Sequence, residues 1–255
     1  MFKLFRRQSK RIGVYIDGFN LYYGMRDTFG RGTPGWRWLD VASLSDAIAQ
    51  RHTRASKVAK ITYCTALRTR PNDETSVADQ TAYLETLSID KRVEVVHGNY
   101  VEVSGKGILL SGHRNKSRKF LKLSLTEEMP IPDWLHHKIV INERGEKHLL
   151  INYDGFTEKR TDVNLASILL KDIYTKKVDE VIVISNDGDL KLPLDFARSI
   201  VRVILVNPQP RSLAKALVGE NSEGVGGHIW LNLDSELIMQ NQFAERFSST
   251  KPTGW

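Results

Sequence analysis

The chain has 255 residues, of which 41% are hydrophobic and 26% are charged, as is usual for a globular protein. No apolar run approaches the roughly 20 residues that a membrane-spanning helix needs, and the single cysteine, Cys64, excludes an intramolecular disulfide framework. The net charge of +7 favours a polyanionic partner such as nucleic acid, and the basic N-terminal arm (1–10) lacks the apolar core of a secretory signal, so the cytoplasm is the expected compartment.

The first predicted strand is the apolar run RIGVYI at 11–16, and it ends directly at Asp17. A helix is expected to begin within the next few residues, Gly18, Phe19 and Asn20. Asp17 therefore lies between a buried strand and a helix, where a carboxylate can cap the helix or bind a ligand. This stretch alone leaves both interpretations open.

Strands and helices then alternate. A helix is predicted over 39–50, a strand over 57–67, a helix over 73–88 and a strand over 93–96. Alternation of this kind is typical of a parallel sheet covered by helices.

The alternation stops between residues 97 and 153. Two hairpins are predicted there, one turning at 104–106 and the other at 143–146. Between them lies the run HRNKSRKFLK at 113–122, which contains five Lys or Arg residues. This run predicts a phosphate-binding surface, with a solvated basic loop as the alternative.

The alternation resumes with a predicted helix over 157–173, which carries Asp162 in its first turn. Asp172, near the end of that helix, opposes the helix dipole and is expected to have a basic partner. The β-branched run VIVI at 181–184 predicts a fully buried strand, followed by the acidic turn SNDGD and another helix. A last strand over 200–206, a short helix over 212–218 and a terminal helix over 231–247 complete the prediction.

Four acids stand at strand ends or helix starts: Asp17, Asp162, Asp187 and Asp189. The carboxyl ends of parallel strands share one edge of a sheet, so these acids can meet there. Close carboxylates repel each other unless a cation lies between them, and a cluster without His or Cys suits Mg²⁺ or Mn²⁺. The alternative is that each acid caps its own helix.

Three ordered blocks of the sequence resemble the signature blocks of the NYN domain, a PIN-like family of metal-dependent ribonucleases whose bacterial branch includes LabA-like proteins. They are YIDGFNLYY at 15–23, EKRTDVNLA at 158–166 and VISNDGDL at 183–190. The resemblance implies a three-layer α/β PIN-like domain with a central parallel sheet of about five strands. The domain is expected over 11–220 with an inserted basic β-hairpin region at 98–153, and 221–255 is expected to form a C-terminal helix and tail packed on it.

The resemblance also implies the site. Asp17, Asp162, Asp187 and Asp189 match the metal-binding and catalytic acids of the family, with Mg²⁺ or Mn²⁺ as cofactor. The expected supporting residues are Asn20, Asn164, Ser185 and Asn186. Gly188 and the pair Arg160-Thr161 depart from the usual blocks, but neither departure removes an acid.

RNA is the expected partner. Its phosphates are expected to contact basic side chains, namely Arg68, Arg70, Arg114, Lys116, Arg118, Lys119, Lys159 and Arg160. Three alternatives remain: a nuclease acting on single-stranded DNA, an RNA-binding regulatory module without catalysis, and a phosphatase-like hydrolase. A second copy of the chain or a protein partner is left open, and no membrane is expected.

Overall fold

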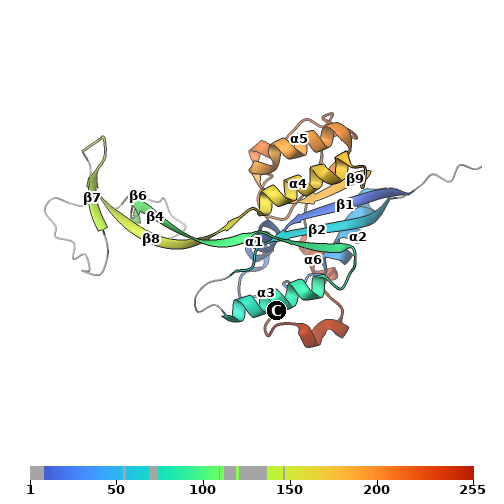
Figure 1. Cartoon of the computed structure of the whole chain (residues 1–255), viewed down its shortest axis with the longest axis horizontal. Coiled ribbons are helices and arrows are strands. Elements are labelled where there is room, and N and C mark those ends of the chain that lie inside the picture. Colours follow the sequence, from blue (N-terminus) through green and yellow to red (C-terminus); the bar gives the residue numbers. More distant parts are fainter. Residues whose placement is uncertain are drawn as a thin grey trace, which may run out of the picture. The chain divides into compact units, whose positions relative to one another are not determined.

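The computed structural model describes residues 9–53, 56–68, 74–108, 110–111, 119–120, 137–145 and 147–255. The chain divides into two compact units, one formed by residues 1–100 together with 158–255 and the other by residues 101–157. Figure 1 shows the helices and strands of both units.

A six-stranded sheet forms the centre of the larger unit. Its strands are β1 (Lys10–Asp17), β2 (Ser56–Thr65), β3 (Val93–His97), β9 (Glu180–Ile184), β10 (Arg202–Asn207) and β11 (Ile229–Asn232). They lie in the order β11-β10-β9-β1-β2-β3, and every neighbouring pair is parallel. The predicted α/β class is confirmed. Strand β11 was not predicted, because this four-residue edge strand follows a glycine-rich segment and has no clear period.

Helices cover both faces of this sheet. Strand residues alternate between the two faces, so Ile182 and Ile184 pack in one core while Val181 and Val183 pack in the other. The first core includes residues of α1 (Gly18–Phe29), α2 (Val41–His52), α3 (Glu74–Leu87) and α6 (Ser235–Gln240). The second includes residues of α4 (Thr161–Tyr174) and α5 (Lys191–Ile200), which Figure 1 shows together on one side of the sheet. This arrangement is the predicted three-layer fold.

The prediction of a long terminal helix is wrong. Strand β11 occupies the beginning of that segment, and α6 starts only at Ser235, where the side chain of Asp234 accepts a hydrogen bond of 2.6 Å from the N–H of Leu237. The helix ends at Gln240, because the amide of Asn241 donates to the Leu237 carbonyl and competes with the helical pattern. Short 3-10 turns form at η1 (Gly188–Leu190), η2 (Lys215–Leu217) and η3 (Glu245–Thr250), and η2 stands where a short helix was expected.

Two buried acids away from the acidic cluster are paired with cations. Asp172 accepts hydrogen bonds from Lys60 Nζ at 2.9 Å and from the Tyr15 hydroxyl at 3.2 Å, which confirms the basic partner expected for it. Glu180 pairs with Lys10 Nζ at 2.7 Å. Pairing of this kind offsets the cost of removing a charge from water.

The smaller unit contains an antiparallel sheet in the order β4-β8-β7, formed by β4 (Asn99–Ile108), β8 (Lys147–Lys159) and β7 (His137–Ile141). The predicted hairpin at 143–146 is confirmed, since Ile141 pairs with Lys147 across it. The hairpin at 104–106 is wrong, because β4 continues through Gly105 and pairs with β8. The ring of Tyr153 in β8 lies so close to Gly105 that a Cβ there would be 2.6 Å from it. A further two-stranded sheet joins β5 (Leu110–Ser111) to β6 (Lys119–Phe120).

Among the residues that the structure describes, no helix is both long enough and apolar enough to cross a bilayer.

A close backbone approach yields a prediction about stability. A Cβ on Gly24, in helix α1, would lie 2.3 Å from the Pro208 carbonyl oxygen. Gly24→Ala should therefore lower the free energy of unfolding by about 1–3 kcal/mol, although alanine favours a helix. Gly32→Ala is the matched control, because nothing lies within 4 Å of its added methyl group. Urea denaturation measures both, and equal stability of the two variants would contradict this packing.

Candidate metal centre

The order of the strands creates a switch point in the larger unit. Counted along the chain, the sheet reads 3-2-1-4-5-6, and the order reverses between β1 and β9. In open α/β sheets, ligands bind outside the carboxyl ends of the strands at such a point. Asp17 is the last residue of β1, and Asp187 lies in the turn that follows β9. The sheet topology therefore brings these two acids to one place.

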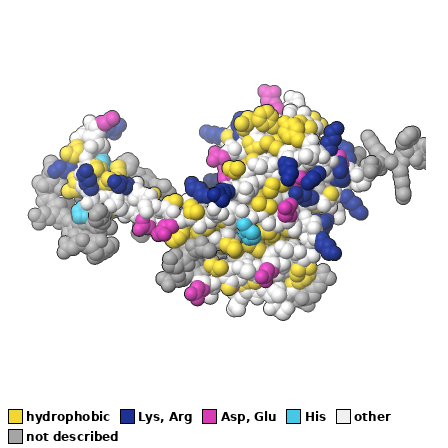
Figure 2. Space-filling model, in the orientation of Figure 1, with side chains coloured by type: hydrophobic (Ala, Val, Ile, Leu, Met, Phe, Trp, Pro, Cys, Tyr) yellow, Lys and Arg dark blue, Asp and Glu magenta, His cyan; other side chains and the backbone are white. Residues whose placement is uncertain are grey.

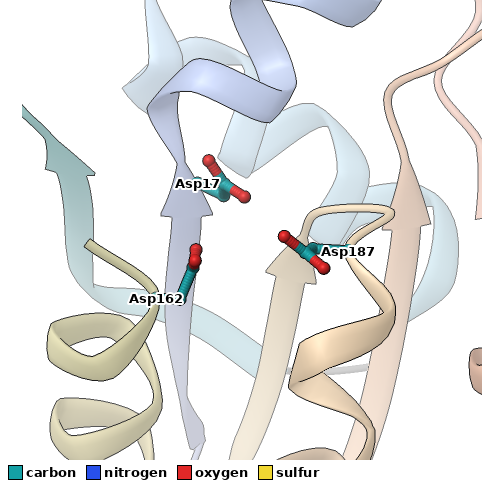
Figure 3. A group of neighbouring side chains, drawn as sticks. All are labelled: Asp17, Asp162 and Asp187. Atoms are coloured by element: carbon teal, nitrogen blue, oxygen red, sulfur yellow. The ribbon is translucent and has the colours of Figure 1, made fainter. Parts of the chain in front are cut away.

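Three carboxylates converge at the switch point. Asp17, Asp162 and Asp187 each offer one oxygen, and these oxygens all lie within 4.8 Å of one another. Figure 3 shows the three side chains around a common space, with Asp17 from the end of β1, Asp162 from the first turn of α4 and Asp187 from the turn after β9. The convergence depends on segments that are far apart in the sequence.

A serine hydroxyl links two of these acids. Ser185 Oγ donates to Asp17 Oδ2 at 3.0 Å and accepts the backbone N–H of Asp187 at 3.1 Å. Asp17 Oδ1 also caps helix α1 by accepting the N–H of Asn20 at 2.9 Å. Asp17 is thus a helix cap and a member of the cluster at once, so the cap predicted at this position is confirmed and ligand binding by Asp17 stays a prediction.

Asn20 and Asn186 connect the ends of neighbouring strands. Asn20 Oδ1 accepts the N–H of Asn186 at 2.9 Å. The side chain of Asn186 donates to the Ser212 carbonyl at 3.2 Å and accepts the N–H of Ala214 at 2.7 Å. Both asparagines therefore hold the loops around the cluster.

Gln209 belongs to the same network, although no role was predicted for it from the sequence. Its amide donates to Asn20 Oδ1 at 3.4 Å and accepts from Asn186 Nδ2 at 3.1 Å. The available signal was its position directly after a buried parallel strand, in the segment Asn207-Pro208-Gln209. That segment must leave the sheet at the same edge as Asp17.

The cluster is strongly anionic. Burial, followed by the charges of Asp162 and Asp187, raises the pKa of Asp17 to about 6, although hydrogen bonds from Asn20 and Ser185 act in the opposite direction. Burial, together with the charges of Asp187 and Asp189, also raises the pKa of Asp162. Within the described ranges, no Lys or Arg forms an ion pair with the three acids, whereas the buried Asp172 has Lys60.

Glu158 is a fourth carboxyl group near the cluster, and it was not among the predicted site residues. Burial and the charges of Asp17 and Asp162 raise the pKa of Glu158 to about 7, while a hydrogen bond with Thr161 lowers it. Cys64 lies nearby and is buried, which raises the pKa of its thiol to about 12, so it is not a reactive thiolate.

The remaining predicted site residues lie around the cluster in different ways. Asp189 is exposed and is not one of the three converging acids, but its N–H donates to Asp187 Oδ1 at 2.9 Å. Asn164 donates to the His97 carbonyl at 3.3 Å and so fixes the end of β3. Lys159 and Arg160 are exposed just before α4, where Arg160 has a φ of 78°.

The other predicted RNA-binding residues are only partly described. Arg68 is half-buried after β2, and Lys119 lies in β6. Arg70, Arg114, Lys116 and Arg118 fall outside the described residues, so their assignment stays a prediction.

The donor set of the cluster fits a hard divalent cation. All three groups are carboxylates, and oxygen ligands of this kind suit Mg²⁺ or Mn²⁺ rather than softer metals. The missing countercharge among the described residues is what a bound cation would supply. The cluster can therefore hold a metal ion, whose identity is unassigned.

Fold and site together define an α/β domain with an acidic centre at its topological switch point, and residues 11–223 match the model of the NYN domain. The chain belongs to the NYN domain family, a PIN-like nuclease family. It is 28% identical over 216 residues to the 6-hydroxy-3-succinoylpyridine 3-monooxygenase HspA of Pseudomonas putida (strain DSM 28022 / S16), covering 78% of this chain and 59% of that protein. The chain thus spans less than two thirds of that relative's length.

A solved structure is also similar, the protein of unknown function VPA0982 from Vibrio parahaemolyticus RIMD 2210633. It has a TM-score of 0.47 and 15% identity, with 90% of this chain and 96% of that one covered.

The raised pKa of Asp17 predicts a pH-dependent stability. The metal-free folded state holds this proton more tightly than the unfolded chain, so the contribution of Asp17 to stability is fully present below the ordinary pKa of 3.8 and is lost as the pH rises through about 6. Asp17→Asn removes this charge and keeps an oxygen for the helix cap. The substitution should raise the free energy of unfolding in EDTA by on the order of 1–3 kcal/mol at about pH 8, and the gain should vanish below about pH 4.

Urea denaturation at the two pH values measures this effect, and thermal unfolding with added Mg²⁺ or Mn²⁺ supplies a second readout. The metal should stabilise the wild type and not Asp17→Asn. Asp27→Asn, at an exposed acid of helix α1, is the control and should respond like the wild type. Equal stabilisation of all three proteins by the metal would contradict a cation site at Asp17.

Proposed function

We propose that the protein is a Mg²⁺- or Mn²⁺-dependent ribonuclease that hydrolyses phosphodiester bonds in RNA. The observation that carries this proposal is the convergence of Asp17, Asp162 and Asp187 at the switch point of an NYN domain, with no cation partner among the described residues. Such a centre would suit a substrate that is itself anionic, because a divalent ion held by these carboxylates would offset the negative charge of a phosphate.

The roles of the residues follow from their contacts. A bound divalent ion would supply an activated water and offset negative charge on the phosphate. Asp17, Asp162 and Asp187 would hold that ion, while Ser185 fixes the orientation of the Asp17 carboxylate at 3.0 Å. Asp189 is exposed and bonded to Asp187 through its backbone, so we assign it a role through water rather than direct ligation.

Basic side chains would bind the phosphate backbone. On the face drawn in Figure 2, Lys and Arg side chains are spread over the surface of the larger unit. The assigned contacts near the acidic centre are Arg68, Lys159 and Arg160. Contacts to phosphates carry no sequence preference by themselves, and the same chemistry acts on single-stranded DNA. RNA is proposed over DNA on the basis of the family.

A single substitution tests the catalytic proposal. Asp187→Asn removes one of the three charges and retains the size of the side chain. RNA cleavage in Mg²⁺ or Mn²⁺ should therefore fall by at least about a hundredfold. The reason is that each kilocalorie per mole of lost transition-state stabilisation lowers the rate several-fold. Asp27→Asn should cleave like the wild type. Labelled RNA and single-stranded DNA, each with metal or with EDTA, provide the measurement.

Other outcomes of this assay have distinct meanings. Cleavage that persists in Asp187→Asn indicates a contaminating nuclease. Binding of RNA without cleavage under any metal condition would replace the enzyme by an RNA-binding module. A further reaction contains 6-hydroxy-3-succinoylpyridine, dioxygen and an electron donor, because the similar protein from Pseudomonas putida is named as a 3-monooxygenase of that pyridine. Consumption of the pyridine with no cleavage of RNA would overturn the ribonuclease proposal.

The basic run at 113–122 yields a separate prediction. Neutralising Arg114, Lys116, Arg118 and Lys119 should weaken RNA binding and reduce the slope of log affinity against log salt, because fewer counterions are released on binding. The control neutralises the same number of charges at exposed lysines that are assigned no contact, namely Lys57, Lys91, Lys171 and Lys176. Filter binding across a range of salt concentrations measures both slopes, and an unchanged slope in the first variant excludes this surface as an RNA contact.

A further inference from the structure

A cavity of about 300 Å³ lies in the larger unit beside the acidic centre. Helix α1, the end of β2, helix α3 and the C-terminal Trp255 form its walls. Its volume is at the lower end of the range found for small-molecule pockets, which is enough for one planar ring with a sugar attached.

The cavity begins next to the cluster. Gly18, which follows Asp17 directly, lines it, and so does Tyr63 of β2. A Cβ on Gly18 would lie only 2.8 Å from the Tyr63 ring, so the absence of a side chain lets α1 start against this tyrosine. The strand register supports this position, because Tyr63 pairs with Ile16, the residue directly before Asp17. A molecule bound in the cavity would therefore contact Gly18, the residue directly after Asp17, which is one of the proposed metal-binding acids.

Six of the 17 residues that line the cavity are aromatic. Phe19, Tyr22 and Tyr23 come from the first turns of α1, and all three are only half-buried. Trp255, from the C-terminal segment, is also half-buried, and its ring centroid lies 5.8 Å from that of Tyr83. The Arg26 guanidinium lies over the Tyr23 ring at 4.5 Å from its centroid. Partly accessible aromatic rings beside a cavity, such as Phe19, are surfaces on which unstacked bases can stack.

Polar groups complete the lining. Arg31, Arg37 and Arg68 supply positive charge that suits a phosphate attached to the ligand. Asp79 of α3 supplies a carboxylate, which can accept hydrogen bonds from the edge of a base. The Gln80 amide instead holds the end of β2, because it accepts the N–H of Arg68 and donates to the Ala66 carbonyl, each at 2.9 Å. One cavity thus combines stacking surfaces, cations and a carboxylate that can read a base.

We propose that this cavity binds the base of the nucleotide next to the scissile phosphate. The proposal rests on the proposed ribonuclease function and deepens it, because a base held here would position the neighbouring phosphate at the acidic centre. It assigns the protein a preference for the base at that position, which phosphate contacts alone do not provide.

The test compares RNA that has a base next to the cleaved bond with RNA that has an abasic residue there. Wild-type protein first cleaves four homopolymeric RNAs, which identifies the preferred base. In an oligonucleotide with that base at the cut, the abasic replacement should then lower kcat/KM by about tenfold, the size of effect typical of one stacked base. Phe19→Leu keeps apolar volume and removes the ring, so it should lose a similar factor on intact RNA and nothing further on abasic RNA.

Phe196→Leu is the matched control, because Phe196 is 49% exposed on α5 and does not line the cavity. It should respond to the abasic residue as the wild type does. If Phe19→Leu also loses the full tenfold on abasic RNA, the base does not stack on Phe19 and the proposal is overturned.

A binding experiment separates failure of this proposal from failure of the proposed function. The four nucleoside 5′-monophosphates are added to Asp187→Asn protein in EDTA, and saturation-transfer NMR measures their binding. We expect one monophosphate to bind best, Phe19→Leu to weaken it, and Asp79→Asn to change the order of preference by exchanging an acceptor for a donor. This result would support the base site even if the protein cleaved no RNA.

Two results would overturn the base site and leave the nuclease intact. One is cleavage of RNA with neither an effect of the abasic residue nor any binding of the monophosphates. The other is binding of 6-hydroxy-3-succinoylpyridine that none of the four monophosphates displaces. This result would assign the cavity to a free heteroaromatic ring instead of a base.

Discussion

Mutual repulsion among three carboxylates at one edge of the sheet is the constraint on which the rest of this site depends. Asp17 is 6% exposed, and burial raises its pKa to about 6, so its charge is costly in the metal-free protein. The fold offsets comparable costs elsewhere with cations, as Lys60 does for Asp172 at 2.9 Å. At the cluster the described residues supply hydrogen bonds and no ion pair: the Asn20 N–H and the Ser185 hydroxyl donate to Asp17, and the Asp189 N–H donates to Asp187. A strained anionic centre of this kind is ready to receive a cation.

Neighbouring loops hold this centre in place before any ligand binds. Asn20 and Asn186 join the end of β1 to the turn after β9, and Gln209 ties both to the segment that follows β10. The same segment packs against α1, where Gly24 meets the Pro208 carbonyl. Because the carboxylates are already oriented, less conformational entropy is lost when a ligand binds, and the reacting groups need little reorganisation.

The acidic centre and the aromatic cavity share one structural element. Asp17 ends β1 and caps α1, and Phe19, Tyr22 and Tyr23 come from the first turns of that helix. A rigid helix start thus sets the spacing between the proposed metal ion and the proposed base site. In the proposed ribonuclease, this arrangement would let the protein discriminate between bases, because stacking and edge contacts distinguish bases whereas phosphate contacts do not.

Periodicity in the sequence was enough to determine the α/β class, five of the six strands and the positions of Asp17, Asp162 and Asp187 at strand ends or a helix start, because these patterns are local. It was insufficient for β11 and for the short α6, where the edge pairing of Ile229 with Ile204 and the cap by Asp234 decide the structure. Only the tertiary structure separated Asp189 from the three converging acids and brought Glu158 and Gln209 to the site. The physical reason is that distances between such remote residues depend on the order and register of the strands, which no local pattern encodes.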